Sequence, residues 1–258
     1  MSTQNLSRMG SARVSVETLD GIDCVLKQGA SEVEMGFYRT VAPNLVGVNS
    51  PALLKAEGCN LYIERIPFTI SLNELRARSE LYTQLASIHL SEFTPTAPVK
   101  KHNWTTFDTR EALNTLRLSE AVASSIERMQ SISGQIFECN TLISGDTNEG
   151  NWGTRNNGEL VLFDWERFGQ GSPAIDLAPL VNGLGSIGEY EKIISQYIKF
   201  NPVVSETELL EHLIIAKCWI VIEVVNILVS RNNPEKEKYI NWYRVNIPKW
   251  LSSVESAL

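Results

Sequence analysis

The polar run Ser144-Gly-Asp-Thr-Asn-Glu-Gly-Asn151 and, after it, Phe163-Asp-Trp-Glu166 are the two most informative segments of this sequence. The first places Asp146 in a loop between short apolar segments. The sequence Asn156-Asn-Gly158, which lies between the two, is typical of a hairpin turn. A hairpin through this turn would bring Asp164 back towards the loop of Asp146. The sequence therefore predicts that two carboxylates lie close together.

Carboxylates and amides in this arrangement suit phosphoryl transfer. In such a site one carboxylate orients the acceptor hydroxyl and takes its proton, while a second carboxylate and an amide oxygen hold Mg²⁺ against the phosphates. Asp146 suits the first role, and Asp164 with Asn151 suits the second. Lys27 suits the role of a lysine that steadies the leaving phosphates. The alternative for the aspartates is an ordinary turn position, and for Lys27 a solvated strand edge.

The segments before this region alternate in polarity. Residues 13–17 and 23–27 do so on either side of a turn, which predicts a hairpin. A helix is predicted over residues 31–41, with Ser31 as its N-terminal cap. Residues 60–64 are predicted to form a short apolar strand.

Helical spacing replaces alternation further along the chain. One helix is predicted over residues 71–90 and another over residues 109–133, and most of the remainder is predicted to be helical apart from the hairpin described above. The predicted fold class is therefore α+β. A small N-terminal lobe, residues 1–66, would hold an antiparallel sheet and one helix, and a larger, mainly helical C-terminal lobe would take residues 67–258.

The composition is that of a globular protein, with 258 residues, 43% of them hydrophobic, and a net charge of −7. This acidic balance argues against nucleic acid as a partner. The four cysteines form no Cys-x-x-Cys pair, which predicts free thiols rather than a zinc cluster. The first residues contain no apolar core of a signal peptide. The most apolar stretch, residues 213–229, contains Lys217 and Glu223, so we expect a buried helix, no membrane association and a cytoplasmic protein.

The run Ser144 to Asn151 and the segment Asp164-Trp-Glu166 resemble the signature of the aminoglycoside phosphotransferase and choline kinase superfamily. In that signature a His-Gly-Asp-x-x-x-x-Asn loop precedes Asp-Trp-Glu and Asp-Leu-Ala. The third piece is present as Asp176-Leu-Ala178. Four further segments resemble the family in the same order, namely Val25-Leu-Lys27, Glu34-Met-Gly-Phe-Tyr-Arg-Thr-Val-Ala-Pro43, Leu61-Tyr-Ile-Glu64 and Leu85-Ala-Ser-Ile-His89. The resemblance spans residues 13–180 and rests on the order and spacing of the pieces, because each piece alone is a weak signal.

The resemblance implies a bilobal protein-kinase-like fold and an ATP-dependent phosphotransferase that uses Mg²⁺. Its acceptor would be a hydroxyl of a small molecule such as an aminoglycoside, choline or another metabolite. By the same resemblance Asp146 would be the catalytic base, and Asn151 and Asp164 would bind Mg²⁺.

The resemblance also implies how the nucleotide is held. Lys27 would contact the α- and β-phosphates and pair with Glu34, for which Glu32 is an alternative. The hinge around Glu64 to Ile66 would offer backbone hydrogen bonds to adenine.

Four features are predicted to support or depart from this pattern. Asp176 would brace the catalytic loop. Ser144 stands where the family has histidine, and its hydroxyl could still donate one hydrogen bond there. The segment from Ser7 to Ala12, whose only glycine is Gly10, would be a shortened phosphate loop. Glu166 is expected to be solvated.

Two alternatives to a kinase remain at this point. One is a pseudokinase that binds a nucleotide or a metabolite without turnover, and the other is a metal-dependent phosphohydrolase that uses the same carboxylates. The acceptor is undetermined: residues 186–258 would build its pocket but carry no signature, and the acidic balance is consistent with a cationic acceptor. The sequence does not indicate an oligomeric state.

Overall fold

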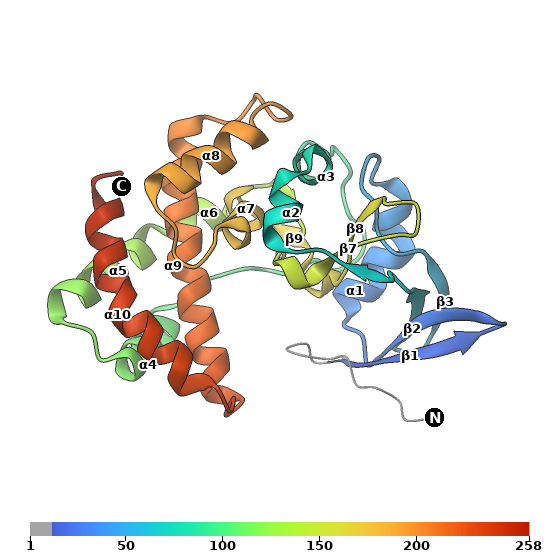
Figure 1. Cartoon of the computed structure of the whole chain (residues 1–258), viewed down its shortest axis with the longest axis horizontal. Helices are drawn as coiled ribbons and strands as arrows, with labels where there is room; N and C mark the ends of the chain where they lie inside the picture. The colour runs from blue at the N-terminus through green and yellow to red at the C-terminus, as the bar shows by residue number, and fades with distance from the viewer. Residues whose placement is uncertain (1–11, 258) are drawn as a thin grey trace. The chain divides into compact units, whose positions relative to one another are not determined.

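The computed structural model describes residues 12–257, whose backbone packs into two compact units (Figure 1). The first unit contains the chain up to Lys101 together with Thr141–Gln170, and the second contains His102–Asn140 and Gly171–Leu258. The predicted lobes, residues 1–66 and 67–258, divide the chain differently, and that division stays a prediction.

A four-stranded antiparallel sheet lies in the first unit. Its strands follow the order β1 (Arg13–Leu19), β2 (Ile22–Gln28), β4 (Asn60–Glu64) and β3 (Leu53–Glu57). The predicted hairpin is confirmed, and its tight turn is closed by Asp20 and Gly21, both with positive φ, as a two-residue hairpin requires. The predicted strand at residues 60–64 is also confirmed, whereas β3 has no alternating pattern and was not predicted.

A helical segment with three successive conformations precedes β3. The predicted helix over residues 31–41 is α1 (Glu32–Gly36), which continues as a π-helical turn, Phe37–Val41, and a 3₁₀ turn, Ala42–Asn44. Ser31 caps it as predicted, because its Oγ accepts from the backbone N of Glu34 at 3.2 Å. One side chain of this helix, Glu34, contacts Lys27 on β2.

The predicted Asn-Asn-Gly hairpin is confirmed. It consists of β7 (Trp152–Thr154) and β8 (Leu160–Leu162), and β5 (Phe68–Thr69) pairs with β7 on the other side. A separate two-stranded ladder pairs β6 (Leu142–Ile143) with β9 (Gly169–Gln170). The loop of Asp146 thus runs from β6 to β7, and the Asp-Trp-Glu segment runs from β8 to β9.

The single helix expected over residues 71–90 is two helices, α2 (Leu72–Ala77) and α3 (Ser79–His89). The break is at Arg78, whose backbone is extended at φ −91° and ψ 126°. The amphipathic spacing continues through Arg78, so the pattern by itself carried no sign of the break.

The second unit is helical. Its helices are α4 (Thr106–Leu116), α5 (Glu120–Ile132), α6 (Gly134–Phe137), α7 (Ala174–Leu177), α8 (Ile187–Tyr197), α9 (Glu206–Ser230) and α10 (Lys236–Val254). The helix expected over residues 109–133 is wrong as one element, because Arg117 takes a left-handed conformation that separates α4 from α5. Four 3₁₀ turns complete the described chain, at Glu149–Asn151, Trp165–Arg167, Ala178–Leu180 and Glu255–Ala257.

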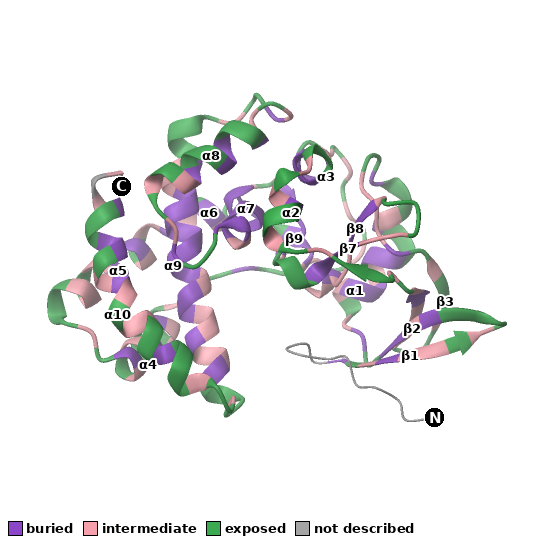
Figure 2. Cartoon of the chain, in the orientation of Figure 1, coloured by how far each residue is buried: buried purple, intermediate pink, exposed green. Residues whose placement is uncertain are grey.

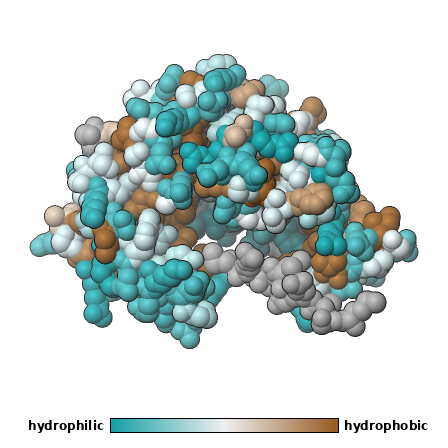
Figure 3. All heavy atoms as spheres, viewed as in Figure 1, coloured by the Kyte–Doolittle hydropathy of each residue, from teal (hydrophilic) through white to brown (hydrophobic). Residues whose placement is uncertain are grey.

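Helix α9 is the core of the second unit. It packs against α4, α5, α6, α7, α8 and α10, and Figure 2 shows buried residues along most of its length. Its length and apolar composition would suit a membrane span, but most of its apolar window is buried inside the protein. The predicted buried helix over residues 213–229 is therefore confirmed. On the face drawn in Figure 3, apolar residues are scattered among hydrophilic ones.

Candidate active site

Three charged side chains from distant parts of the first unit meet at one point. The Nζ of Lys27, on β2, lies 2.5 Å from Oε1 of Glu34 on α1 and 2.8 Å from Oδ1 of Asp164, which follows β8. Lys27 and Glu34 are buried, whereas the side chain of Asp164 is 32% exposed. Burial by itself would lower the pKa of Lys27, but the two carboxylates raise it above its ordinary value. Lys27 therefore stays protonated, and its ammonium group faces the partly exposed carboxylate of Asp164.

The structure decides between the two candidate partners of Lys27. Glu34 points into the protein and is completely buried, whereas Glu32 is exposed on the other side of α1. Burial raises the pKa of Glu34 to about 7, even though the charge of Lys27 opposes this. Its second oxygen, Oε2, has no hydrogen-bond partner among the described residues. Two carboxylates thus share one ammonium group.

Asp164 is held by the packing of its neighbour. The indole of Trp165 is fully buried and stacks on the ring of Phe37, with centroids 3.9 Å apart and planes at 9°, and its Nε1 donates to the O of Leu162 at 3.1 Å. Because Phe37 directly follows α1, this stack joins the helix of Glu34 to the strand end of Asp164. The backbone of Asp164 is left-handed, at φ 67° and ψ 68°, which is uncommon outside glycine and occurs often at functional sites.

The loop of Asp146 is held by its own backbone and by Arg167. Gly145 has a φ of +81°, and a Cβ there would lie 2.3 Å from the O of Arg167. The Nε of Arg167 donates to the O of Gly145 at 3.1 Å. The Nδ2 of Asn148 donates to Oδ1 of Asp146 at 2.7 Å, and the Nδ2 of Asn151 donates to the O of Asp146 at 3.0 Å. The loop therefore presents Asp146 and Asn151 as one rigid pair.

The environment of Asp146 raises the pKa of its carboxyl group. Burial is the largest cause, and the negative charge of Asp164 adds to it. The hydrogen bond from Asn148 and the charge of Arg167 act in the opposite direction. A carboxylate with a raised pKa is a better proton acceptor than an exposed aspartate.

The chemistry of the oxygen donors at this point fits Mg²⁺. Since the Nδ2 of Asn151 is engaged with the protein, its Oδ1 is the atom left for a ligand, and Oδ2 of Asp164 remains beside the Oδ1 that binds Lys27. The backbone N of Phe163 donates to the O of Asn151 at 2.9 Å. Because Asp164 directly follows Phe163, the hairpin keeps Asn151 and Asp164 close together. Among the described residues no group of three His, Cys, Asp or Glu side chains could hold a metal. Carboxylate and amide oxygens of this kind are ligands that Mg²⁺ accepts, usually together with water and phosphate oxygens.

The predicted hinge is partly occupied by protein contacts. The backbone N of Glu64 donates to the O of Ala52 at 2.8 Å, and both carboxylate oxygens of Glu64 bind Arg155. These groups of Glu64 are thus engaged with the protein. Ile66 lies beside Gly153, where a Cβ would be 2.8 Å from the Cγ2 of Ile66. Adenine recognition at Glu64 and Ile66 stays a prediction.

The remaining predicted residues lie in three different places. Ser144 is fully buried at the start of the loop of Asp146. Asp176 is also fully buried, but it lies on α7 in the second unit, so its role as a brace stays a prediction. The predicted phosphate loop, Ser7 to Ala12, lies outside the described residues except for Ala12.

Sequence reasoning missed several residues around this site. Glu166 is half-buried rather than solvated, and burial followed by the charge of Asp164 raises its pKa. Arg167 follows the Asp-Trp-Glu segment directly, and this adjacency was the available signal for it. Asn148 had a comparable signal, because it lies inside the quoted loop. Arg155 has a local partner in Glu159, but no signal pointed to its pairing with Glu64, which lies 91 positions away in the sequence.

No protein-family model matches this sequence, and no curated protein matches it either. Solved structures do match over nearly the whole chain. The GDP and kanamycin complex of APH(2")-IIia has 17% identity and a TM-score of 0.70, and the match covers 96% of this chain and 93% of that one. A choline/ethanolamine kinase family protein from Mesorhizobium loti has 16% identity and a TM-score of 0.68, with 99% and 90% covered.

A third structure, the apoenzyme of macrolide 2'-phosphotransferase MphH from Brachybacterium faecium, has 14% identity and a TM-score of 0.65, with 93% and 90% covered. The chain has the fold of these phosphotransferases and kinases. This match confirms the predicted α+β class and the kinase-like fold that the resemblance implied. At these identities the match concerns the kinase-like fold alone, so the roles of individual residues depend on the geometry of the site.

Proposed function

We propose that this protein is a small-molecule kinase that moves the γ-phosphate of ATP to a hydroxyl group, with Asp146 as the catalytic base. The observation that carries the proposal is the buried contact of Lys27 with both Glu34 and Asp164, next to the loop of Asp146 and Asn151. An ammonium group between two carboxylates, facing a cluster of oxygen donors, suits a polyphosphate and its metal ion. The likeness to phosphotransferases and kinases supports the same reaction.

Each residue has a separate role in this proposal. Lys27 binds the α- and β-phosphate oxygens, and Glu34 holds its ammonium group in place. Asn151 and Asp164 would hold Mg²⁺, which when bound supplies positive charge against the phosphates. Asp146 orients the acceptor hydroxyl and accepts its proton as the oxygen attacks phosphorus. Its raised pKa, caused mainly by burial, suits it to accept that proton.

The acceptor is proposed only as a class. The structural neighbours are named for macrolides, kanamycin, choline and ethanolamine, which are hydroxyl compounds and mostly cationic. The net charge of −7 favours a cation over a polyanion. We place the enzyme in the cytoplasm, where ATP is available, and its four free cysteines are consistent with a reducing compartment.

A pseudokinase is the competing proposal. It is motivated by Ser144, which stands in place of the family histidine. The presence of Asp146, Asn151 and Asp164 in one place argues against it, because binding without turnover does not need a proton acceptor. A phosphohydrolase is disfavoured, because it would leave the Lys27–Glu34 pair without a purpose.

The test is an ADP-release assay. The protein is mixed with Mg-ATP, or with Mg-GTP in a parallel assay of GDP release, and with a panel of macrolides, aminoglycosides, amino alcohols and sugars, and phosphorylated products are identified by mass spectrometry. We expect ADP release that one class of acceptor stimulates and that Asp146→Asn lowers by at least about a hundredfold. Binding of Mg-ATP, measured by calorimetry, should be similar in the wild type and in Asp146→Asn.

The outcomes separate the candidates. Tight nucleotide binding without turnover on any panel member would support the pseudokinase. Acceptor-independent phosphate release that Lys27→Met leaves unchanged would support the phosphohydrolase. Lys55→Met is a matched control, because Lys55 is an exposed lysine of the same sheet whose partner is Glu57.

A further inference from the structure

The β7–β8 hairpin carries both proposed metal-binding residues. Asn151 directly precedes β7 and Asp164 lies two residues after β8, and the hydrogen bond from Phe163 N to Asn151 O links the two ends. Lys27 and the hinge lie on the neighbouring strands β2 and β4, in which Lys27 is opposite Leu61. The position of the hairpin relative to this pair of strands therefore decides how the metal-binding residues lie relative to the lysine.

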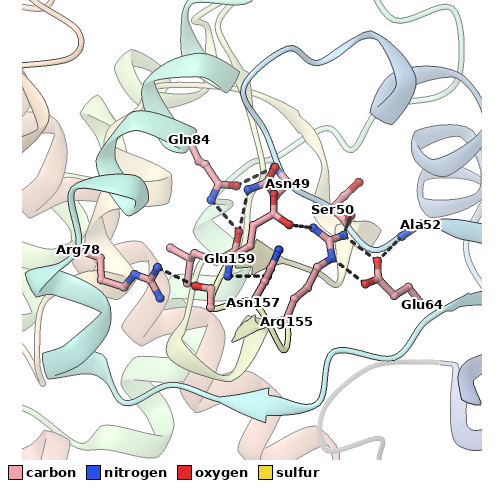
Figure 4. Close-up of polar contacts among 11 residues, drawn as sticks. Asn49, Ser50, Ala52, Glu64, Arg78, Gln84, Arg155, Asn157 and Glu159 are labelled. Atoms are coloured by element: carbon pink, nitrogen blue, oxygen red, sulfur yellow. Dashed lines mark hydrogen bonds and ion pairs between the residues drawn. The ribbon is translucent and has the colours of Figure 1, made fainter.

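Arg155, at the end of β7, connects the hairpin to β4. Its Nε lies 2.7 Å from Oε1 of Glu64, and its Nη2 lies 2.7 Å from Oε2, which makes a two-pronged ion pair (Figure 4). Nη1 of the same group donates to Glu159 at 2.6 Å, and Nη2 also donates to the O of Ser50 at 3.0 Å. The side chains of Arg155 and Glu64 are only 24% and 28% exposed. This geometry needs the planar fork of arginine, which lysine does not have.

A second set of hydrogen bonds ties the same hairpin to the chain before β3. The N of Asn49 donates to Oε1 of Gln84 at 2.8 Å, and the side-chain amides of Asn49 and Gln84 both donate to the O of Leu160, at 3.1 and 3.0 Å (Figure 4). The N of Leu162 donates to the O of Asn49 at 3.0 Å. Gln84 is buried, so these hydrogen bonds are shielded from water and hold β8 against Asn49 and α3.

The ion pair of Lys27 with Asp164 links the end of the hairpin to β2. Under the proposed function, both partners of this pair turn to the ligand when the nucleotide and its metal ion bind. The Arg155–Glu64 pair does not compete with the ligand in this way, because both oxygens of Glu64 are already engaged with protein donors. It is therefore the charged contact that stays in place during binding.

We propose that the Arg155–Glu64 ion pair is a positioning contact that holds the β7–β8 hairpin against β4. Through this contact Asn151 and Asp164 keep their place near Lys27 when Mg-nucleotide binds. This inference rests on the proposed function and assigns to the Glu64 side chain a role distinct from the backbone role expected of the hinge. The lowered pKa of Glu64, caused mainly by its hydrogen bonds to Arg155, is consistent with a permanent contact.

The test measures Mg-ATP binding in the full-length protein by calorimetry, together with the Mg²⁺ dependence of turnover. We expect Arg155→Lys to weaken Mg-ATP binding and to raise the Mg²⁺ concentration for half-maximal activity, each by about tenfold, as is typical when a residue that orients metal ligands is removed. The kcat at saturating Mg-ATP should change less. Glu64→Gln should have a similar effect, and the double variant should be no worse than either single variant.

Arg78→Met is the matched control. The Nη2 of Arg78 donates to the O of Gly158 at 2.9 Å, so it holds the same hairpin at its turn, and its ion-pair partner is Glu80 on α3 rather than Glu64 on β4 (Figure 4). We expect Arg78→Met to lower the melting temperature without changing the Kd for Mg-ATP. Arg155→Lys with an unchanged Kd and an unchanged Mg²⁺ dependence would overturn the positioning role, whatever its melting temperature. A wild-type protein that does not bind Mg-ATP at all would instead overturn the proposed function, and the inference with it.

Discussion

Asp146 and Glu34 are carboxylic acids whose surroundings raise the pKa of each above that of an exposed side chain. Burial is the largest cause for both, and in both cases a nearby cation opposes it. Arg167 is the cation for Asp146, and Lys27 is the cation for Glu34. Under the proposed function, the protonation of these two residues would decide whether the site is ready for catalysis, so pH is the natural variable for an experiment.

The acid side of the pH profile should report on Asp146. As the proposed catalytic base, Asp146 must be ionised, so we expect kcat/KM to fall as the pH drops through a pKa above the ordinary value of 3.8. Arg167→Gln removes a charge that lowers this pKa, so the fall should occur at higher pH. Arg167→Lys keeps the charge and serves as the control. A profile that does not move in Arg167→Gln would contradict the assignment of Asp146 as the titrating group.

Glu34 should make stability depend on pH near neutrality. Its pKa is about 7 in the folded protein and about 4.5 in the unfolded chain, so the protonated form favours folding. Its stabilising contribution is complete below about pH 4.5 and is lost as the pH rises through about 7, by about 1.4 kcal/mol for each unit of the shift.

We therefore expect the stability of Glu34→Gln relative to the wild type to increase from pH 4.5 to pH 7.5, as measured by urea denaturation. The variant should also bind Mg-ATP more weakly at neutral pH, because Lys27 loses a charged partner. Glu32→Gln is the control, since Glu32 is exposed on the same helix. A constant difference between Glu34→Gln and the wild type across this range would show that Glu34 does not titrate there.

At the scale of single elements, loops and strand ends are held by close backbone packing. Gly145 and Gly158 both have positive φ, but only the Cβ built on Gly145 meets another atom, the O of Arg167 at 2.3 Å. Trp165 also fixes a strand end by close packing, because its stack on Phe37 joins the segment after α1 to the end of β8. At Gly145 the loop of Asp146 therefore lies so close to the backbone of Arg167 that no larger side chain fits there.

The two glycines give a matched pair of substitutions. Gly158→Ala should cost about 1 kcal/mol of unfolding free energy, from backbone strain alone. Gly145→Ala should cost more, about 2–4 kcal/mol, because the same strain is joined by a clash with a backbone atom that cannot move freely. It should also lower kcat, since the clash displaces the loop of Asp146. Equal losses of stability and full activity in both variants would contradict this packing.

At the scale of the whole molecule, the second unit is organised around α9, and the charged residue Lys217 lies on that helix inside the core. Lys217 is buried, its Nζ donates to the O of Val181 at 3.0 Å, and burial lowers its pKa to about 7. The protein therefore tolerates an expensive side chain in its most apolar helix. Its removal is a test of how the helical core depends on pH.

A lowered lysine pKa contributes stability above the unfolded value of about 10.5, and this contribution is lost as the pH falls through about 7. Lys217→Met should therefore be more stable than the wild type at pH 6.5, and its advantage should shrink as the pH rises to 9.5, where the lost hydrogen bond to Val181 counts against it by about 1 kcal/mol. Thermal unfolding at the two pH values measures the difference. A variant that is less stable by the same amount at both would show that burial of the charge is not the cause.

The sequence by itself determined the features that depend on neighbouring residues. The hairpin turn at Asn156-Asn-Gly158, the cap of Ser31 and the alternation of β1 and β2 follow from local backbone preferences, and the structure confirms each of them. The order of the chemical residues, from Lys27 to Asp164, could also be read along the chain. The existence and type of the site elements were therefore predictable without knowledge of the tertiary packing.

Only the tertiary structure decided which side chains meet. It selected Glu34 over Glu32, because the packing of α1 buries one and exposes the other. It separated α2 from α3 at Arg78, whose side chain reaches across to Gly158. It also paired Arg155 with Glu64, which lie 91 positions apart. Such contacts depend on how distant strands and helices pack, and burial then sets their energies and pKa values, so local sequence patterns cannot predict them.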